Sequence, residues 1–136
     1  MKNSIKIILI SLLALGLVTG CGKTKEENKN NEQKPIVNTN KDVIKDQEVD
    51  GLKMTNTTLI YENGISTLIT EVSNNTGTDY HLNEFNITVK DKDGNVMSNL
   101  KGYVGGTIPN GETRTINTSS DLDLSKATSI EYSVNK

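Results

Sequence analysis

Few side chains in this chain of 136 residues could take part in covalent or metal chemistry. It contains one histidine, His81, and one cysteine, Cys21. A zinc site needs several His or Cys ligands, and one residue of each does not supply them. A Ser-His-Asp triad would have to use His81, which lies early in a predicted strand, and the chain has no Gly-x-Ser-x-Gly elbow. We therefore expect no enzymatic activity and no cofactor, and we interpret His81 as a partly exposed strand residue.

Two acidic segments, residues 91–95 and 121–125, have the alternating oxygen ligands with which calcium loops begin. An EF-hand loop also needs Gly at its sixth position and Glu at its twelfth. Neither segment has either residue at the required position. Asp, Asn and Gly also form tight turns, so we interpret both segments as turns. The alternative is a weak calcium site where acidic loops cluster at one end of the fold.

A short apolar segment, residues 7–18, precedes Cys21. It is too short to span a bilayer, which needs roughly 20 apolar residues. Lys2 and Lys6 place positive charge before it, and small residues follow it. This order is typical of a secretory signal peptide. The alternative, a buried core helix, agrees neither with the terminal position nor with the missing amphipathic period.

The end of this segment, Val18-Thr19-Gly20-Cys21, resembles the lipobox of bacterial lipoproteins. The resemblance implies that signal peptidase recognises Val18, Thr19 and Gly20 and cleaves before Cys21, whose thiol carries a diacylglyceryl group. Two acyl chains hold a protein stably at a membrane, whereas one chain binds only marginally. We therefore expect residues 1–20 to be removed. The mature chain is then an outward-facing, extracytoplasmic protein anchored to the cell membrane by lipid.

The mature chain is acidic. Removing residues 1–20 takes away two lysines and no acid, so 15 basic residues become 13, against 17 acidic ones. This balance argues against nucleic acid as a partner and against an electrostatic attraction to anionic lipid. We expect the acyl chains alone to hold the protein at the membrane.

Residues 21–48 follow the signal peptide and are dominated by Lys, Glu, Asn and Asp. Such a segment cannot bury enough apolar surface to offset the entropy of ordering, so we predict a disordered tether. About 27 residues of flexible chain would hold a domain roughly 30 Å from the membrane on average. Fully stretched, they would reach roughly 90 Å. The alternative is a weak helix over residues 41–49, supported by a few i, i+4 charge pairs.

Residues 49–136 are predicted to form one all-β domain. Turn signals such as Asn63-Gly64 separate segments rich in β-branched residues, and residues 85–90 alternate between apolar and polar. We expect about six strands, over residues 52–61, 65–73, 80–90, 96–104, 113–119 and 129–135, with one helical turn within 121–128. This spacing predicts an antiparallel immunoglobulin-like β-sandwich of about six to seven strands.

Three motifs of this domain resemble the FxLYD-type domains of bacterial surface lipoproteins. They are Val72-Ser73-Asn74-Asn75-Thr76, the strand from Phe85 that ends in Asp91-Lys92-Asp93-Gly94, and Ile108-Pro109-Asn110-Gly111-Glu112-Thr113. The resemblance spans most of residues 65–134. It implies an immunoglobulin-like sandwich that serves as an extracytoplasmic binding or spacer module, with motifs that are structural rather than catalytic.

We therefore expect a non-enzymatic, lipid-anchored module that binds or positions something at the cell envelope. Tyr103 lies among the glycines of residues 102–106 and is the candidate contact residue for an envelope protein or a cell-wall glycan. The alternative for Tyr103 is a plain strand-end turn. The alternative function is an accessory subunit of a larger envelope complex, in which an exposed strand edge pairs with another protein.

Overall fold

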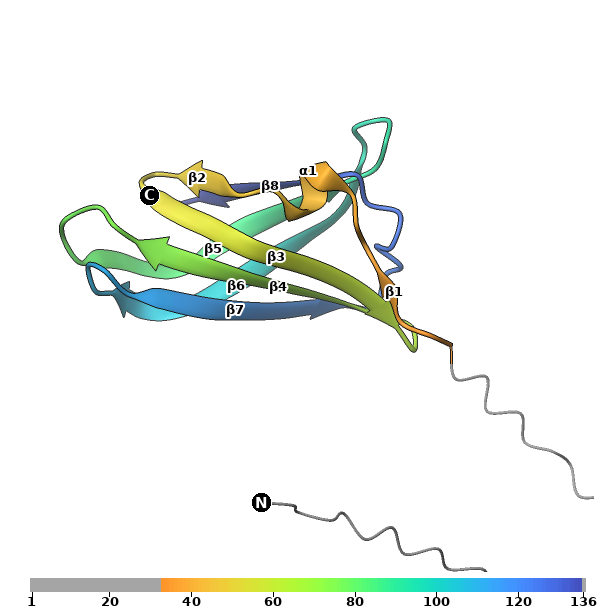
Figure 1. Cartoon of the computed structure of the whole chain (residues 1–136), viewed down its shortest axis with the longest axis horizontal. Coiled ribbons are helices and arrows are strands. Elements are labelled where there is room, and N and C mark those ends of the chain that lie inside the picture. The colour runs from red at the N-terminus through yellow and green to blue at the C-terminus, as the bar shows by residue number, and fades with distance from the viewer. Residues whose placement is uncertain (1–32, 136) are drawn as a thin grey trace, which may run out of the picture. The chain divides into compact units, whose positions relative to one another are not determined.

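The computed structural model describes residues 33–135, which form a sandwich of two antiparallel β-sheets (Figure 1). The first sheet has the order β3–β4–β7 and the second has the order β6–β5–β8. Two short strands, β1 and β2, pair with the outer edge of β3. The strands are β1 (Ile36–Val37), β2 (Gln47–Val49), β3 (Leu52–Glu62), β4 (Ile65–Asn74), β5 (Tyr80–Lys90), β6 (Val96–Ile108), β7 (Thr113–Ser120) and β8 (Ser129–Val134).

This architecture confirms the predicted antiparallel all-β sandwich. The order of its six long strands corresponds to A-B-E in one sheet and C′-C-F in the other sheet of a variable-type immunoglobulin domain. The connection from β4 to β5 leads from the first sheet to the second, and the connection from β6 to β7 leads back to the first. The connection from β7 to β8 leads to the second sheet again. The described residues contain eight strands rather than six or seven, because β1 and β2 precede the strands that the sequence pattern reveals.

The core fills the space between the two sheets. Alternate residues of each long strand point inward, as in β5, where Phe85, Ile87 and Val89 are fully buried. The Phe85 ring packs edge-on against the Tyr132 ring of β8, with 5.9 Å between the ring centroids. The other fully buried large side chains are Val43, Leu52, Met54, Leu59, Leu68, Val72, Ile108, Leu124 and Ile130.

Two local predictions differ from the structure. β6 continues four residues beyond the predicted end at residue 104, because Gly105 lies in a bulge of the strand and Gly106 pairs with Leu82, rather than both forming a loop. Both have positive φ, 85° and 112°, which glycine adopts without steric cost. Residues 121–128 form a loop without a helix, in which residues 124–127 make a turn closed by a hydrogen bond from Ala127 N to Leu124 O.

The folded domain also begins earlier than residue 49, where the sequence predicts the end of the tether. β1, the single-turn helix α1 (Lys41–Ile44) and β2 all pack on the edge of the sandwich. Val43 is fully buried, and the Asn38 amide donates to Ser125 O and Ala127 O at 3.1 and 2.8 Å. Pairing of backbone to the edge of β3 needs few apolar side chains, which is why composition alone places these residues in the tether.

Candidate functional site

The predicted lipidation site, Val18-Thr19-Gly20-Cys21, lies outside the described residues, and its role stays a prediction. The remaining candidate, Tyr103, lies on β6 with its side chain 70% exposed. It is therefore part of a strand and not of the strand-end turn that was the alternative.

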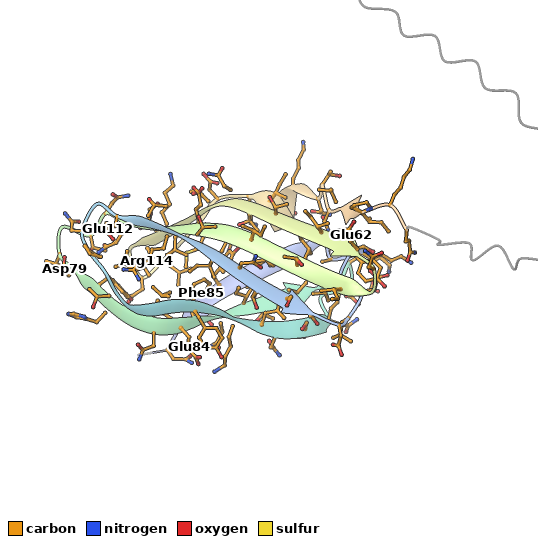
Figure 2. All side chains as sticks on the ribbon, turned by 90° about the horizontal axis from the view of Figure 1, so that it is seen from below. Glu62, Asp79, Glu84, Phe85, Glu112 and Arg114 are labelled. Carbon is orange, nitrogen blue, oxygen red and sulfur yellow. The ribbon has the colours of Figure 1, made fainter. Side chains whose placement is uncertain are left out.

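Tyr103 belongs to the outward face of the β6–β5–β8 sheet, which we name the Tyr103 face. Strand register places its side chains in cross-strand pairs: Tyr103 lies opposite Glu84, Lys101 opposite Asn86, and Asn99 opposite Thr88. Figure 2 shows Glu84 pointing away from the sandwich, while the neighbouring Phe85 points between the sheets. The face consists of Glu84, Asn86, Thr88, Lys90, Asn99, Lys101, Tyr103, Glu131 and Ser133.

The position of Tyr103 depends on the glycine that precedes it. Gly102 lies opposite Phe85 and faces the core. A Cβ atom at Gly102 would lie 2.4 Å from Cζ of Phe85, so the ring occupies the space that any larger residue needs. The buried ring and the glycine hold this part of β6 against β5, and Tyr103 consequently stands on the solvent side.

Charged side chains on the Tyr103 face are paired with one another. Lys101 binds Glu84, and this carboxylate raises the pKa of Lys101. Lys90 donates to Glu131 at 2.7 Å. Each pair joins one basic and one acidic side chain, so the two pairs add no net charge to the face.

Amides and hydroxyls fill the space between these ion pairs. The Asn86 amide donates to Asn135 Oδ1 at 3.0 Å, and the Thr88 hydroxyl donates to Asn99 Oδ1 at 3.1 Å. Each Asn side chain has two donors and two acceptor sites, so capacity for further hydrogen bonds is left over. The Tyr103 face therefore presents one exposed aromatic ring among uncharged hydrogen-bonding groups and balanced charges.

His81 lies at the margin of this face, as a strand residue. Its Nδ1 is 2.9 Å from Oγ1 of Thr107, on the opposite strand. The two residues line a shallow hollow with Leu82, Asn83 and Gly106, at the bulge where β5 and β6 shift register. A catalytic triad requires a carboxylate that accepts a hydrogen bond from the histidine ring. Among the described residues, no carboxylate hydrogen-bonds to the His81 ring.

The acidic segments are turns in the structure. Asp91 Oδ1 accepts hydrogen bonds from the backbone N–H of Asp93 and Asn95, at 2.8 and 2.9 Å. The Asn95 side-chain amide donates to Asp91 Oδ2 at 3.2 Å, and this bond, together with the backbone bond from Asn95, lowers the pKa of Asp91. Asp123 Oδ1 accepts from Ser125 N at 2.9 Å, and its pKa is lowered by Ser125 in the same way. Within residues 33–135, no three His, Cys, Asp or Glu side chains gather as a metal site requires.

The first and third motifs of the FxLYD resemblance meet at the opposite end of the sandwich from β1. Asn74 is fully buried there, and its side-chain N–H groups donate to Thr78 O and Ile108 O at 2.8 Å each. Its backbone N–H donates to Glu112 O, and its carbonyl accepts from Gly111 N. These motifs fasten the β4–β5 turn to the β6–β7 turn, so their role in the fold is structural.

Sequence reasoning missed the partners of Tyr103 and the buried role of Asn74. The alternation over residues 85–90 places Asn86 and Thr88 on the wet side of β5. The pairing of β5 with β6 shifts register twice, at Leu82/Glu84 and at Val89/Lys90. No pattern in the sequence predicts either shift. Asn74 appears in the sequence only as a turn residue.

Comparison with known proteins gives no relative: no protein-family model, no curated protein and no solved structure matches this chain. The resemblance to FxLYD-type domains therefore stays a prediction. In the described part of the chain, no helix is long and apolar enough to cross a membrane.

Proposed function

We propose that the chain is a lipid-anchored protein of the bacterial cell membrane whose non-enzymatic β-sandwich binds a ligand of the cell envelope. The anchor is supported by the resemblance of Val18-Thr19-Gly20-Cys21 to a lipobox. The observation that carries the binding role is Tyr103, an aromatic residue 70% exposed on the outward face of β6. Aromatic residues on protein surfaces are enriched where partners bind.

The chemistry of the Tyr103 face favours a neutral, hydroxyl-rich ligand. Its charges are already paired, between Lys101 and Glu84 and between Lys90 and Glu131. A sugar ring offers an apolar C–H surface that stacks on an aromatic ring, and hydroxyls that amide side chains recognise. A cell-wall glycan fits both requirements, and an outward-facing anchor would keep the domain within reach of one.

A binding assay with insoluble cell-wall glycan tests this role. Purified full-length protein in detergent micelles should sediment with the glycan, and Tyr103→Ala should weaken this binding several-fold. Thr115→Ala is the matched control, because Thr115 is an exposed strand residue on the other sheet. Equal binding of wild type and Tyr103→Ala would contradict the proposed site.

A photo-crosslinking amino acid at position 103 separates this proposal from its alternative. Cross-links to glycan in intact cells support a binding module. A single stoichiometric protein partner, without glycan, would instead support an accessory subunit of an envelope complex. Hydrolysis of ester, peptide or glycan substrates by the purified protein would contradict both.

The anchor has a separate test. Cys21→Ala removes the thiol that would carry the diacylglyceryl group, so the protein should stay unprocessed or leave the membrane fraction. Metabolic labelling with a fatty acid should mark the wild type and not the variant. A processed, membrane-bound Cys21→Ala protein would rule out lipidation at this residue.

A further inference from the structure

Exposed large apolar side chains gather at one end of the sandwich. The β3–β4 turn, the β5–β6 turn and the β7–β8 loop all lie at the end where β1 joins β3 (Figure 1). We name this the β1 end. Five side chains exposed by 44–52% lie there: Ile36, Val37, Ile65, Val96 and Leu122.

Specific backbone and side-chain contacts connect these loops to one another. Val37 lies opposite Ile60 of β3, two residues before the turn that leads to Ile65. The Ser66 hydroxyl donates to Leu122 O at 2.7 Å, which places the β7–β8 loop beside the start of β4. Thr128, at the other end of that loop, donates to the carbonyl of Lys90, which lies opposite Val96.

The opposite end of the sandwich is polar. Its turns carry Asp50, Asn75, Asp79, Asn110 and Glu112, and none of the exposed large apolar side chains of the described residues lies in them. Figure 2 shows the contrast in position, with Glu62 at the β1 end and Asp79 and Glu112 at the other end. Two other exposed large apolar side chains of the described residues, Ile44 on α1 and Tyr103 on β6, lie outside the β1 end. Singly exposed apolar residues are ordinary, whereas five of them at one end of a domain mark an interaction surface.

The chain that leads to Cys21 leaves from this same end. Gln33, the first described residue, is 12 positions from Cys21, so the β1 end lies at most about 40 Å from the lipidated residue, whatever the conformation between them. This limit replaces the reach of roughly 90 Å that a tether up to residue 48 implies. A short connection keeps the local concentration of the β1 end at the bilayer high, so a weak attraction suffices for contact.

We propose that the β1 end rests on the lipid bilayer, with Ile36, Val37, Ile65, Val96 and Leu122 entering the headgroup region. This inference rests on the proposed lipidation of Cys21. The β1 end carries charges of both signs with an acidic excess, which cannot attract anionic lipid: the basic residues are Lys34, Lys92 and Lys126, and the acidic residues are Glu62, Asp91, Asp93, Asp121 and Asp123. The contact is consequently apolar rather than electrostatic, and it aims the polar end of the domain away from the membrane.

Site-specific labelling tests the contact, because Cys21 is the only cysteine in the chain. In lipidated protein, an introduced cysteine is the one free thiol. Ile65→Cys and Leu122→Cys place a fluorophore at the β1 end, and Asn75→Cys and Asn110→Cys place it at the polar end. In phosphatidylcholine vesicles that contain a headgroup nitroxide lipid, quenching should be several-fold greater at positions 65 and 122 than at 75 and 110.

Two outcomes are distinguishable by sedimentation. Protein that is absent from the vesicle pellet contradicts the anchor, and the inference falls with it. Protein that pellets with equal quenching at all four positions contradicts the contact alone. Adding anionic phosphatidylglycerol should change the quenching little, and a strong dependence on anionic lipid would overturn the apolar contact.

A longer connection separates attraction from mere proximity. A Gly-Ser insertion of 20 residues after Lys25 should leave the quenching at position 65 in place if apolar side chains hold the β1 end to the bilayer. In the same background, Val96→Ser with Leu122→Ser should lower it several-fold. Loss of quenching on insertion alone would show that the short connection, and not the apolar surface, brings the domain to the membrane.

Discussion

The hydroxyl of Tyr132, on β8, lies 2.9 Å from Oγ1 of Thr57, on β3, and so joins the two sheets through a hydrogen bond in the core. Oγ1 of Thr57 also lies 2.9 Å from Oγ1 of Thr70, which donates in turn to Thr55 O. Thr57 points inward because β3 has a bulge at Asn56, where φ is 51°. The bulge therefore turns the Thr57 hydroxyl into the core, where it bonds the Tyr132 hydroxyl. Burial raises the pKa of Tyr132.

Removing the two partners of this bond should have unequal effects. Tyr132→Phe leaves Thr57 still bonded to Thr70, so we expect a loss of about 1 kcal/mol in the free energy of unfolding. Thr57→Val removes the buried bonds of Oγ1 to both the Tyr132 hydroxyl and the Thr70 hydroxyl, and we expect a loss of about 2 kcal/mol. Urea unfolding followed by circular dichroism measures both. Thr58→Val, on the outward side of β3, is the control, and a larger loss for Tyr132→Phe than for Thr57→Val would contradict this account.

Gly102→Ala should destabilise the domain through steric overlap with Phe85. The new Cβ would lie 2.4 Å from a fully buried ring, so we expect a loss of about 1–3 kcal/mol. Gly111→Ala is the comparison, because a Cβ atom added there has no neighbour within 4 Å. Only its left-handed backbone conformation is strained, at a cost of about 1 kcal/mol. The Gly102→Ala and Phe85→Leu changes should together cost less than their sum, because the smaller side chain vacates the overlapping space. Additive losses would show that the ring is not the obstacle.

Asn74→Asp should make stability depend on pH. The carboxylate cannot donate to Thr78 O or Ile108 O, and its burial raises its pKa above the value in the unfolded chain. A raised folded pKa gives stability that is present below the unfolded pKa and lost as pH rises through the folded pKa. The variant should therefore lose more stability relative to wild type at pH 7 than at pH 4. Asn75→Asp, next to it but exposed, should show no such difference.

The decrease of the free energy of unfolding at alkaline pH should depend on Tyr80. Its hydroxyl binds Asp50, and burial together with this carboxylate raises the pKa of Tyr80 from 10.0 to about 12. The folded state holds the phenolic proton more tightly, so this contribution is present below pH 10 and disappears between about pH 10 and 12. Tyr80→Phe should flatten the loss of stability in that range. Asp50→Asn should lower the pKa of Tyr80 only in part, because burial is the larger cause, and ultraviolet titration of phenolate measures it.

The strands were predictable where their signals are local. Asn63-Gly64 predicts the β3–β4 hairpin, and both residues have the positive φ that such a turn needs, 51° and 83°. The strand predicted over residues 80–90, with its alternation at residues 85–90, has the same bounds as β5. Gly105-Gly106 misled the prediction, since a glycine that forms a bulge and one that forms a loop look alike in sequence.

The candidate site was predictable only as the single residue Tyr103. Its neighbours across the strand, such as Glu84, follow from a register that bulges shift, and a shift of one residue exchanges the two faces of a strand. The β1 end was hidden for a different reason. It assembles from β1 and three loops or loop ends far apart in sequence, each with one or two apolar residues that no periodicity connects.

Val43 tests whether residues 36–49 belong to the folded domain. Its side chain is fully buried, whereas Val37, six residues earlier in the same segment, is 52% exposed. Val43→Ala removes two methyl groups from the core and should lower the free energy of unfolding by about 2 kcal/mol. Val37→Ala should change it by less than about 0.5 kcal/mol, as for most surface substitutions. In a disordered tether the two valines would be equivalent. Equal, negligible effects in urea unfolding would therefore return residues 36–48 to the tether and lengthen the connection to Cys21.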